Sequence, residues 1–151
     1  MHTRRESLKH SAIVAGLLAS AGMFPGHALA YNKGAFDAKT VADAVKAFGG
    51  GAPAESKDVT ITGPDIAENG AVVPIGAATT LAGVKHMLIL VEKNPCALVA
   101  KFDVTDAVEA NFSTRAKMGQ SSDVYAVVIT NDGKALFAKK EVKVTLGGCG
   151  G

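Results

Sequence analysis

The chain has 151 residues, with 16 basic and 14 acidic side chains and four histidines, and a chain of this length suits a single domain. Three basic residues, three histidines and one acidic residue lie within the first thirty positions, so the remainder carries 13 positive and 13 negative side chains. A neutral surface exerts no long-range attraction on nucleic acid or anionic membranes, which excludes both as partners. With His86 as its one histidine and no tryptophan, that remainder is poorly equipped for independent catalysis.

Residues 1–30 have the three parts of an export signal. A basic stretch at residues 3–9 precedes an apolar run at residues 12–19 and the small-x-small site Ala28-Leu29-Ala30. The run is too short to span a bilayer. Paired Arg4-Arg5 resembles a twin-arginine signal, although Ser7 stands where that pattern usually has a large apolar residue. We expect cleavage and export to the periplasm by the twin-arginine route; the alternative is an uncleaved anchor.

The next elements in chain order are a short helix and a series of strands. Residues 38–48 place apolar side chains at helical spacing and are followed by Gly49-Gly50-Gly51, which ends a helix. A period of two then predicts strands, in which residues 84–91 are apolar on both faces and therefore central, while Pro74 indicates an edge or a bulge. The predicted strands are residues 58–62, 71–75, 84–91, 98–104, 110–118, 124–130 and 134–146.

The last two predicted strands are joined by Asn131-Asp132-Gly133, a strong hairpin signal because Asp-Gly tolerates positive φ. About seven short strands with turns between them predict a mainly β fold, an immunoglobulin-like antiparallel sandwich. The predicted organisation is therefore a signal at residues 1–30, a sandwich domain with a short N-terminal helix at residues 31–146, and a flexible arm at residues 147–151.

That arm is the most informative stretch of the sequence. Four glycines, Gly147, Gly148, Gly150 and Gly151, surround Cys149. Glycine has the greatest backbone freedom, so ordering this stretch would cost entropy that no burial offsets. The slim tether predicts a covalent carrier whose thiol enters the active sites of other proteins. No basic group is expected next to the thiol, so its activation must come from a partner.

Other interpretations of the two cysteines remain open at the level of sequence. Cys149 could form a structural disulfide with Cys96, or an intermolecular disulfide with a second copy or a partner, and a glycine-rich tail could also be simple disorder. Cys96 is interpreted as a small buried residue where a turn meets a strand. If it is exposed instead, it could trap Cys149 or bind sulfur itself.

Four stretches of the chain together carry a resemblance to a known family. They are Val59-Thr60-Ile61, residues 68–75, Glu92-Lys93-Asn94-Pro95 and the Gly-Gly-Cys-Gly-Gly motif at residues 147–151. In these stretches the sequence resembles the SoxY family of thiosulfate-oxidation proteins. The resemblance implies an immunoglobulin-like fold and a non-catalytic carrier without a cofactor, with Cys149 as the covalent attachment site for sulfur intermediates. Cys96 departs from the family pattern.

The resemblance also implies a set of partners. These are a SoxZ subunit in a heterodimer, the c-type cytochrome SoxAX that joins thiosulfate to the cysteine, the hydrolase SoxB that releases sulfate, and in some organisms SoxCD. Two rival functions stay open: an interaction module that uses Cys149 only for an intermolecular disulfide, and an enzyme such as a thiol sulfurtransferase.

The remaining polar residues predict no further site. His86 lies on the same face of its strand as Leu88 and Leu90, where a lone histidine is expected to be packed or hydrogen-bonded rather than a metal ligand. Asp103, Asp106 and Glu109 are expected to form a solvated acidic cluster. No Ser-His-Asp triad or pair of catalytic carboxylates can be assembled from this inventory.

Overall fold

The computed structural model describes residues 9–10, 13, 16 and 32–145, in two units, Met1–Tyr31 and Asn32–Gly151. Most of the predicted signal segment therefore lies outside the described residues. Among those that are described, no helix has the length and apolar character needed to cross a membrane. The elements of the second unit are α2 (Lys33–Phe36), α3 (Val41–Ala47), β1 (Ala54–Glu55), β2 (Val59–Thr62), β3 (Ile66–Ala67), β4 (Val73–Thr79), β5 (Val84–Val91), β6 (Leu98–Asp103), β7 (Asn111–Ala116), β8 (Ser122–Thr130) and β9 (Ala135–Val144).

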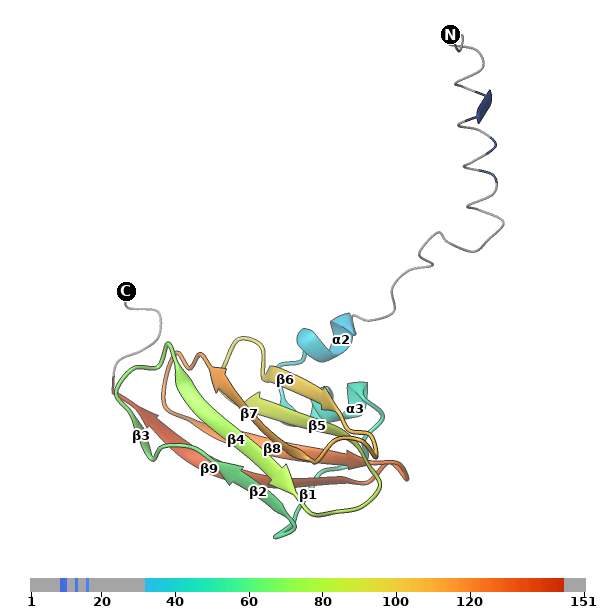
Figure 1. The fold of residues 1–151 in the computed structure, drawn as a ribbon. Coiled ribbons are helices and arrows are strands. Elements are labelled where there is room, and N and C mark those ends of the chain that lie inside the picture. The colour runs from blue at the N-terminus through green and yellow to red at the C-terminus, as the bar shows by residue number, and fades with distance from the viewer. Residues whose placement is uncertain (1–8, 11–12, 14–15, 17–31, 146–151) are drawn as a thin grey trace. The chain divides into compact units, whose positions relative to one another are not determined.

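The strands form two sheets (Figure 1). The larger sheet has the order β1-β9-β8-β5-β6, with β3 also paired to β9, and the smaller sheet has the order β2-β4-β7. The predicted mainly β, immunoglobulin-like sandwich is confirmed. The sequence prediction missed β1 and β3, two-residue strands that pair in parallel with β9 and brace its two ends.

Two hydrophobic clusters lie on opposite faces of the larger sheet. One fills the space between the two sheets and includes Met87, Ile89 and Val128. The other lies between the larger sheet and helices α2 and α3, and includes Leu88 and Val127. Because successive side chains of a strand point to opposite faces, β5 must be apolar on both, as the sequence predicted for a central strand.

Helix α3 is shorter than the predicted 38–48 because both of its ends are capped. The Thr40 side chain accepts a hydrogen bond from the Asp43 amide and begins the helix at Val41. At the other end Gly49 adopts φ +79°, and the amides of Gly49 and Gly50 donate to the carbonyls of Lys46 and Val45. This pair of bonds is the Schellman arrangement. The prediction that glycine ends the helix is confirmed; the preceding helix α2 was not predicted.

Strand β6 contains an irregularity that the alternating pattern concealed. Ile89 pairs with Ala100, but Leu90 pairs with Leu98, so Val99 is an extra residue. Such a bulge shifts the residues on its two sides to opposite faces. Leu98 consequently packs beside the helices, whereas Ala100 and Phe102 pack between the sheets.

The prediction of an edge or a bulge at Pro74 is correct for that position, although not for its strand as a whole. Strand β4 lies at the centre of the smaller sheet, not at an edge. However, β2 pairs only with residues Gly76–Thr79 of β4, so Pro74 has a partner strand on one side alone, at Arg115. A proline lacks the amide donor and is tolerated there because no second strand requires one.

The predicted hairpin between β8 and β9 is confirmed. Gly133 has φ +82° and its amide donates to the Thr130 carbonyl at 2.9 Å. Among described residues only glycines have positive φ, so the turn uses one left-handed position rather than the two of a type I′ turn. The hairpin fixes β9 antiparallel to β8 and directs the C-terminal end of β9 to the end of the sandwich where β8 begins.

Candidate functional site

The predicted carrier residues, Cys149 and the four glycines around it, lie outside the described residues. The structure does describe the point from which they extend. Strand β9 ends at Val144 and the described chain ends at Thr145. Cys149 is four residues further on, and at most about 3.5 Å per residue it lies within roughly 14 Å of Thr145.

This root of the arm is held by hydrogen bonds from two other segments. The Val144 amide donates to Ser121 Oγ at 2.9 Å, and the Thr145 amide donates to the Ala67 carbonyl at 3.1 Å. The Thr145 hydroxyl also donates to the Glu68 carbonyl at 3.1 Å. The anchoring residues come from β3 and from the β7–β8 loop, so the starting point of the arm is fixed to the body of the domain.

A hollow of about 530 Å³ lies beside this root, between the β5–β6 loop and the β7–β8 loop. Ser121, which holds Val144, directly follows Gln120 in its wall. The amide of Lys93, on the other wall, donates to Ser122 Oγ at 3.0 Å, and Asn94 Nδ2 donates to the Lys117 carbonyl at 2.8 Å. The lining residues are Lys93, Asn94, Pro95, Cys96, Lys117, Gly119 and Gln120.

Cys96 lies in the wall of this hollow and is a free thiol. Its Sγ donates to the Phe36 carbonyl at 2.6 Å and lies 3.5 Å from the Leu98 carbonyl. The residue is half-buried where the turn meets β6, so the interpretation as a buried residue at that junction is only partly right. Its thiol fastens α2 to the sheet and also borders an open hollow.

His86 contacts residues that are distant in the sequence. Its Nδ1 lies 2.6 Å from Asp103 Oδ1, and Lys101 Nζ lies 2.6 Å from the same oxygen. The ring packs at an angle on Phe48, with centroids 6.0 Å apart, and Lys101 Nζ lies 5.5 Å from the Phe48 ring centroid. The expectation of a packed histidine is confirmed, and Asp103 is an interacting residue rather than a merely solvated one.

Electrostatics favour the neutral form of this imidazole. Burial lowers the pKa of His86 first, and the Lys101 ammonium lowers it further, which outweighs the opposing effect of Asp103. The pKa of Asp103 is also lowered, chiefly by its hydrogen bond from Lys101. The cluster is thus a structural contact between β5, β6 and the end of α3.

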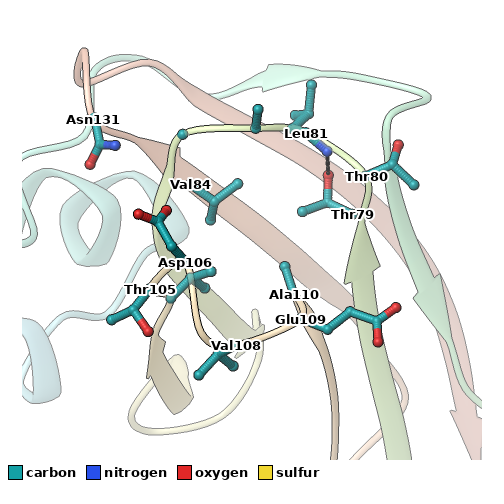
Figure 2. Close-up of a pocket in the computed structure, with 13 residues that line it drawn as sticks. Thr79, Thr80, Leu81, Val84, Thr105, Asp106, Val108, Glu109, Ala110 and Asn131 are labelled. Carbon is teal, nitrogen blue, oxygen red and sulfur yellow. Dashed lines mark hydrogen bonds between the residues drawn. The ribbon is translucent and has the colours of Figure 1, made fainter.

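A second hollow, of about 540 Å³, lies at the opposite end of the sandwich. It is bordered by the β4–β5 turn, the β6–β7 loop and Asn131 after β8 (Figure 2). The amide of Leu81 donates to Thr79 Oγ1 at 3.2 Å and closes the turn. The carboxylates of Asp106 and Glu109 lie on opposite sides of this hollow and do not converge on one point.

Within residues 32–145 and the few described residues before them, no group of three or more His, Cys, Asp or Glu side chains could hold a metal ion. Sequence reasoning did not show that Ser121, Thr145, Lys93 and Lys117 lie together at the end of the domain where β9 finishes. These residues belong to separate loops and strands, and no local pattern links them. Only the pairing of β8 with β9 and β5 brings them to one end of the domain.

The fold and this arm-bearing end define an immunoglobulin-like sandwich protein with a cysteine segment attached to its last strand. The family model described as "Sulfur oxidation protein SoxY" matches residues 44–149. The chain therefore belongs to the SoxY family. The resemblance inferred from the sequence motifs is confirmed.

A solved structure supports this assignment. The sulfur carrier protein SoxY from Chlorobium limicola f thiosulfatophilum is 37% identical, with a TM-score of 0.57, over 62% of this chain and 84% of that one. A superoxide reductase (neelaredoxin) from Ignicoccus hospitalis is 16% identical, with a TM-score of 0.51, over 57% and 78% of the two chains, which indicates a shared fold alone. No curated protein sequence matches the chain.

Proposed function

We propose that this protein is a covalent carrier of sulfur intermediates in periplasmic thiosulfate oxidation, with Cys149 as the attachment site. The glycines Gly147, Gly148, Gly150 and Gly151 form the arm on which the sulfur is presented to other enzymes. The chain itself performs no catalysis. A partner enzyme supplies the base and the electron acceptor that the chain lacks.

The observation that supports this proposal most is the extent of the family match. It runs from residue 44, in α3, to residue 149, and so includes the cysteine itself. The similar protein from Chlorobium is described as a sulfur carrier. The amides of Val144 and Thr145 donate hydrogen bonds to Ser121 and Ala67, so the point from which the arm extends is fixed to the domain.

The proposed chemistry has two steps. First, the Cys149 thiol and thiosulfate join through a new S–S bond, giving Cys149–S–S–SO3⁻ with release of one proton and two electrons. The electrons pass to a c-type cytochrome of the SoxAX kind. Second, water attacks the sulfonate sulfur of the adduct in a SoxB-like hydrolase. Sulfate leaves with two protons, and a persulfide anion stays on Cys149.

The proposal includes partners and a compartment. A SoxZ-like subunit forms a heterodimer with this chain, and a SoxCD-like enzyme oxidises the remaining sulfur where it is present. Residues 1–30 direct export to the periplasm by the twin-arginine route, and the mature domain is free of the membrane after cleavage. The neutral charge balance of the remaining chain accords with a protein that binds neither nucleic acid nor anionic lipid.

The test is mass spectrometry of the C-terminal peptide after the mature protein has been incubated with thiosulfate and the other components of the system. We expect the mass of the thiosulfate adduct on Cys149, followed by the persulfide when the hydrolase is added. A Cys149→Ser variant should carry neither. A Cys96→Ser variant is the matched control and should be loaded like the wild type.

Two results would contradict the proposal. One is an unmodified Cys149 peptide under every condition together with a reductant-sensitive disulfide to a partner, which would favour the interaction module. The other is turnover of thiosulfate by the isolated chain, which would make it an enzyme.

A further inference from the structure

The loop that joins β3 to β4 contains an asparagine followed by a glycine, Asn69-Gly70. Asn69 is exposed, whereas Gly70 is buried. The Ala71 amide donates a hydrogen bond to Asn69 Oδ1 at 2.8 Å, which makes this segment an Asx turn. The ring that the hydrogen bond closes contains both the carboxamide carbon of Asn69 and the backbone nitrogen of Gly70, so the turn limits how far these two atoms can move apart.

The backbone of Gly70 is held at its carbonyl rather than at its amide. The Met118 amide donates to the Gly70 carbonyl at 2.7 Å. Within residues 32–145, no hydrogen bond engages the Gly70 amide itself. Its nitrogen is therefore not occupied by an acceptor. Because glycine has no β carbon, no side chain on the residue hinders the approach of this nitrogen to a neighbouring group.

A free amide nitrogen beside a carboxamide carbon supports the loss of ammonia from asparagine, and we propose that Asn69 is a site of this spontaneous covalent modification. The hydrogen bond from Ala71 draws electron density towards Oδ1 and makes the carboxamide carbon more electrophilic. The Gly70 nitrogen bonds to that carbon and closes a succinimide ring, the bond from the carbon to Nδ2 breaks, and Nδ2 leaves as ammonia with the proton of the Gly70 amide. Solvent water then opens the ring at the side-chain carbonyl, which gives aspartate, or at the backbone carbonyl, which gives isoaspartate; no electrons are transferred.

The other asparagines of the chain lack this combination. Each precedes a residue that carries a side chain, which crowds the attacking nitrogen, and in one pair that residue is proline, which has no amide hydrogen. These pairs are Asn32-Lys33, Asn94-Pro95, Asn111-Phe112 and Asn131-Asp132. Asn111 also lies within β7, where pairing with β4 holds the backbone extended. Asn69 is therefore expected to react first.

The residues on both sides of Asn69 hold other segments of the domain, which gives the modification a structural consequence. The Glu68 carbonyl accepts a hydrogen bond from the Thr145 hydroxyl at 3.1 Å, and the Gly70 carbonyl accepts from the Met118 amide. Aspartate adds a negative charge and leaves the main chain unchanged. Isoaspartate carries the main chain through the side-chain carbons and so inserts an additional atom between these two anchors. Close-packed neighbours do not absorb that atom without a shift, so isoaspartate loosens the loop and aspartate does not.

The test follows every asparagine of the purified protein during incubation at mildly alkaline pH, where the amide nitrogen loses its proton more readily. Peptide mass spectrometry measures the replacement of NH2 by OH at each position, in the folded protein and in a parallel sample unfolded with urea. We expect Asn69 of the folded protein to react at least about tenfold faster than any other asparagine. Its rate should lie within about threefold of the rate in urea, because no local opening is needed to free the Gly70 amide.

Two glycine variants isolate the role of the attacking nitrogen. Gly70→Ala places a β carbon beside it and should slow the reaction of Asn69 about tenfold or more. Gly119→Ala, where a β carbon meets open space, is the matched control and should leave the rate unchanged. Both variants are also compared in urea, so the result does not depend on whether Gly70→Ala folds. Hydrogen exchange of the Met118 amide should be about fivefold faster in the purified isoaspartate form than in the unmodified protein, and unchanged in Asn69→Asp.

Survival of Asn69 in the folded protein together with its loss in urea would overturn the modification site, because the fold would then protect the residue. Equal rates at Asn69 and Asn131 in the folded protein would do the same, as would an unchanged rate in Gly70→Ala. Equal exchange of the Met118 amide in the isoaspartate form and in Asn69→Asp would refute the loosening of the loop. None of these measurements involves Cys149, so the carrier role is tested separately.

Discussion

The two ends of the sandwich carry opposite chemistry on one framework. The end where β9 finishes has the root of the cysteine arm, a free thiol at Cys96 and a hollow with two lysines. The end where β8 finishes has a hollow of similar volume bordered by Asp106 and Glu109. These two ends of the sandwich lie roughly 25 Å apart, which is the length of strand β8. The β8–β9 hairpin decides from which of these two ends the Cys149 segment extends, because it sets the direction of the last strand.

The sharpest test of this comparison is a loss of function at one end only. Cys149→Ser should reduce thiosulfate-dependent electron transfer in the reconstituted system to the level of a mixture without this chain, because the variant lacks the proposed attachment site. Asp106→Asn with Glu109→Gln at the opposite end should leave the rate unchanged. The measurement is cytochrome reduction on addition of thiosulfate. Residual turnover with Cys149→Ser would refute the functional difference between the ends.

The next prediction compares the free energies of unfolding of two variants, each with a glycine replaced at one end of the sandwich. Gly133→Ala places a side chain at φ +82° and should lower the free energy of unfolding by about 1–2 kcal/mol. Gly119→Ala meets open space without a positive φ, and should change it by no more than about 0.5 kcal/mol. Urea denaturation measures both. A cost at Gly119 equal to that at Gly133 would show that the hairpin glycine has no special backbone role.

A smaller, local effect is expected at the root of the arm. Ser121→Ala removes the acceptor of the Val144 amide and should destabilise the end of β9 by about 1 kcal/mol. Exchange of the Val144 amide hydrogen should then be about fivefold faster, because local opening governs exchange there. The control is Ser113→Ala, an exposed position on β7. Unchanged protection of Val144 would indicate that β3 alone holds the arm.

The smallest effect is a pH dependence at His86. Because burial and Lys101 lower its pKa below the ordinary 6.5, the unfolded chain binds the proton more readily than the folded protein. His86 should therefore stabilise the fold fully above pH of about 6.5, and lose that contribution as pH falls through the unfolded pKa towards the folded one. Asp103 opposes the shift, so the slope is shallow.

The variant that isolates this contribution is His86→Gln. Its free energy of unfolding should be flatter than that of the wild type just below pH of about 6.5, as measured by urea denaturation at a series of pH values. Loss of stability below about pH 4 should persist, because Asp103 has a pKa below its ordinary value and loses its contribution as it is protonated. A rise in wild-type stability as pH falls through 6.5 would contradict the direction of the His86 shift.

Local features of the fold were readable from the sequence. Residues 84–91 were predicted as a central strand with the bounds that β5 has, because both faces are apolar. The sequence also predicted the end of α3 at Gly49 and the turn at Gly133. Both positions have positive φ, which glycine adopts readily and residues with a side chain disfavour. The four glycines around Cys149 indicated a carrier for a related reason. Glycine gives the backbone the greatest freedom, and a covalent carrier needs a slim, movable tether.

Other features were decided only by tertiary structure. Alternation placed Leu98 and Phe102 on one face, but the bulge at Val99 separates them because the strand must pair with β5 while filling two different cores. Pro74 indicated an edge or a bulge. Its strand is the central one of the smaller sheet, but β2 is too short to reach Pro74, which therefore has a neighbouring strand on one side alone.

The sequence by itself determined the strand-rich class, the turns and the glycine-flanked cysteine segment, because each depends on residues close together in the chain. The neighbours of that segment were decided by the tertiary structure alone. Lys93, Lys117 and Ser121 lie at the end of the domain where β9 finishes because strands distant in the sequence pair side by side. That pairing follows from burial of the shared core rather than from any local pattern.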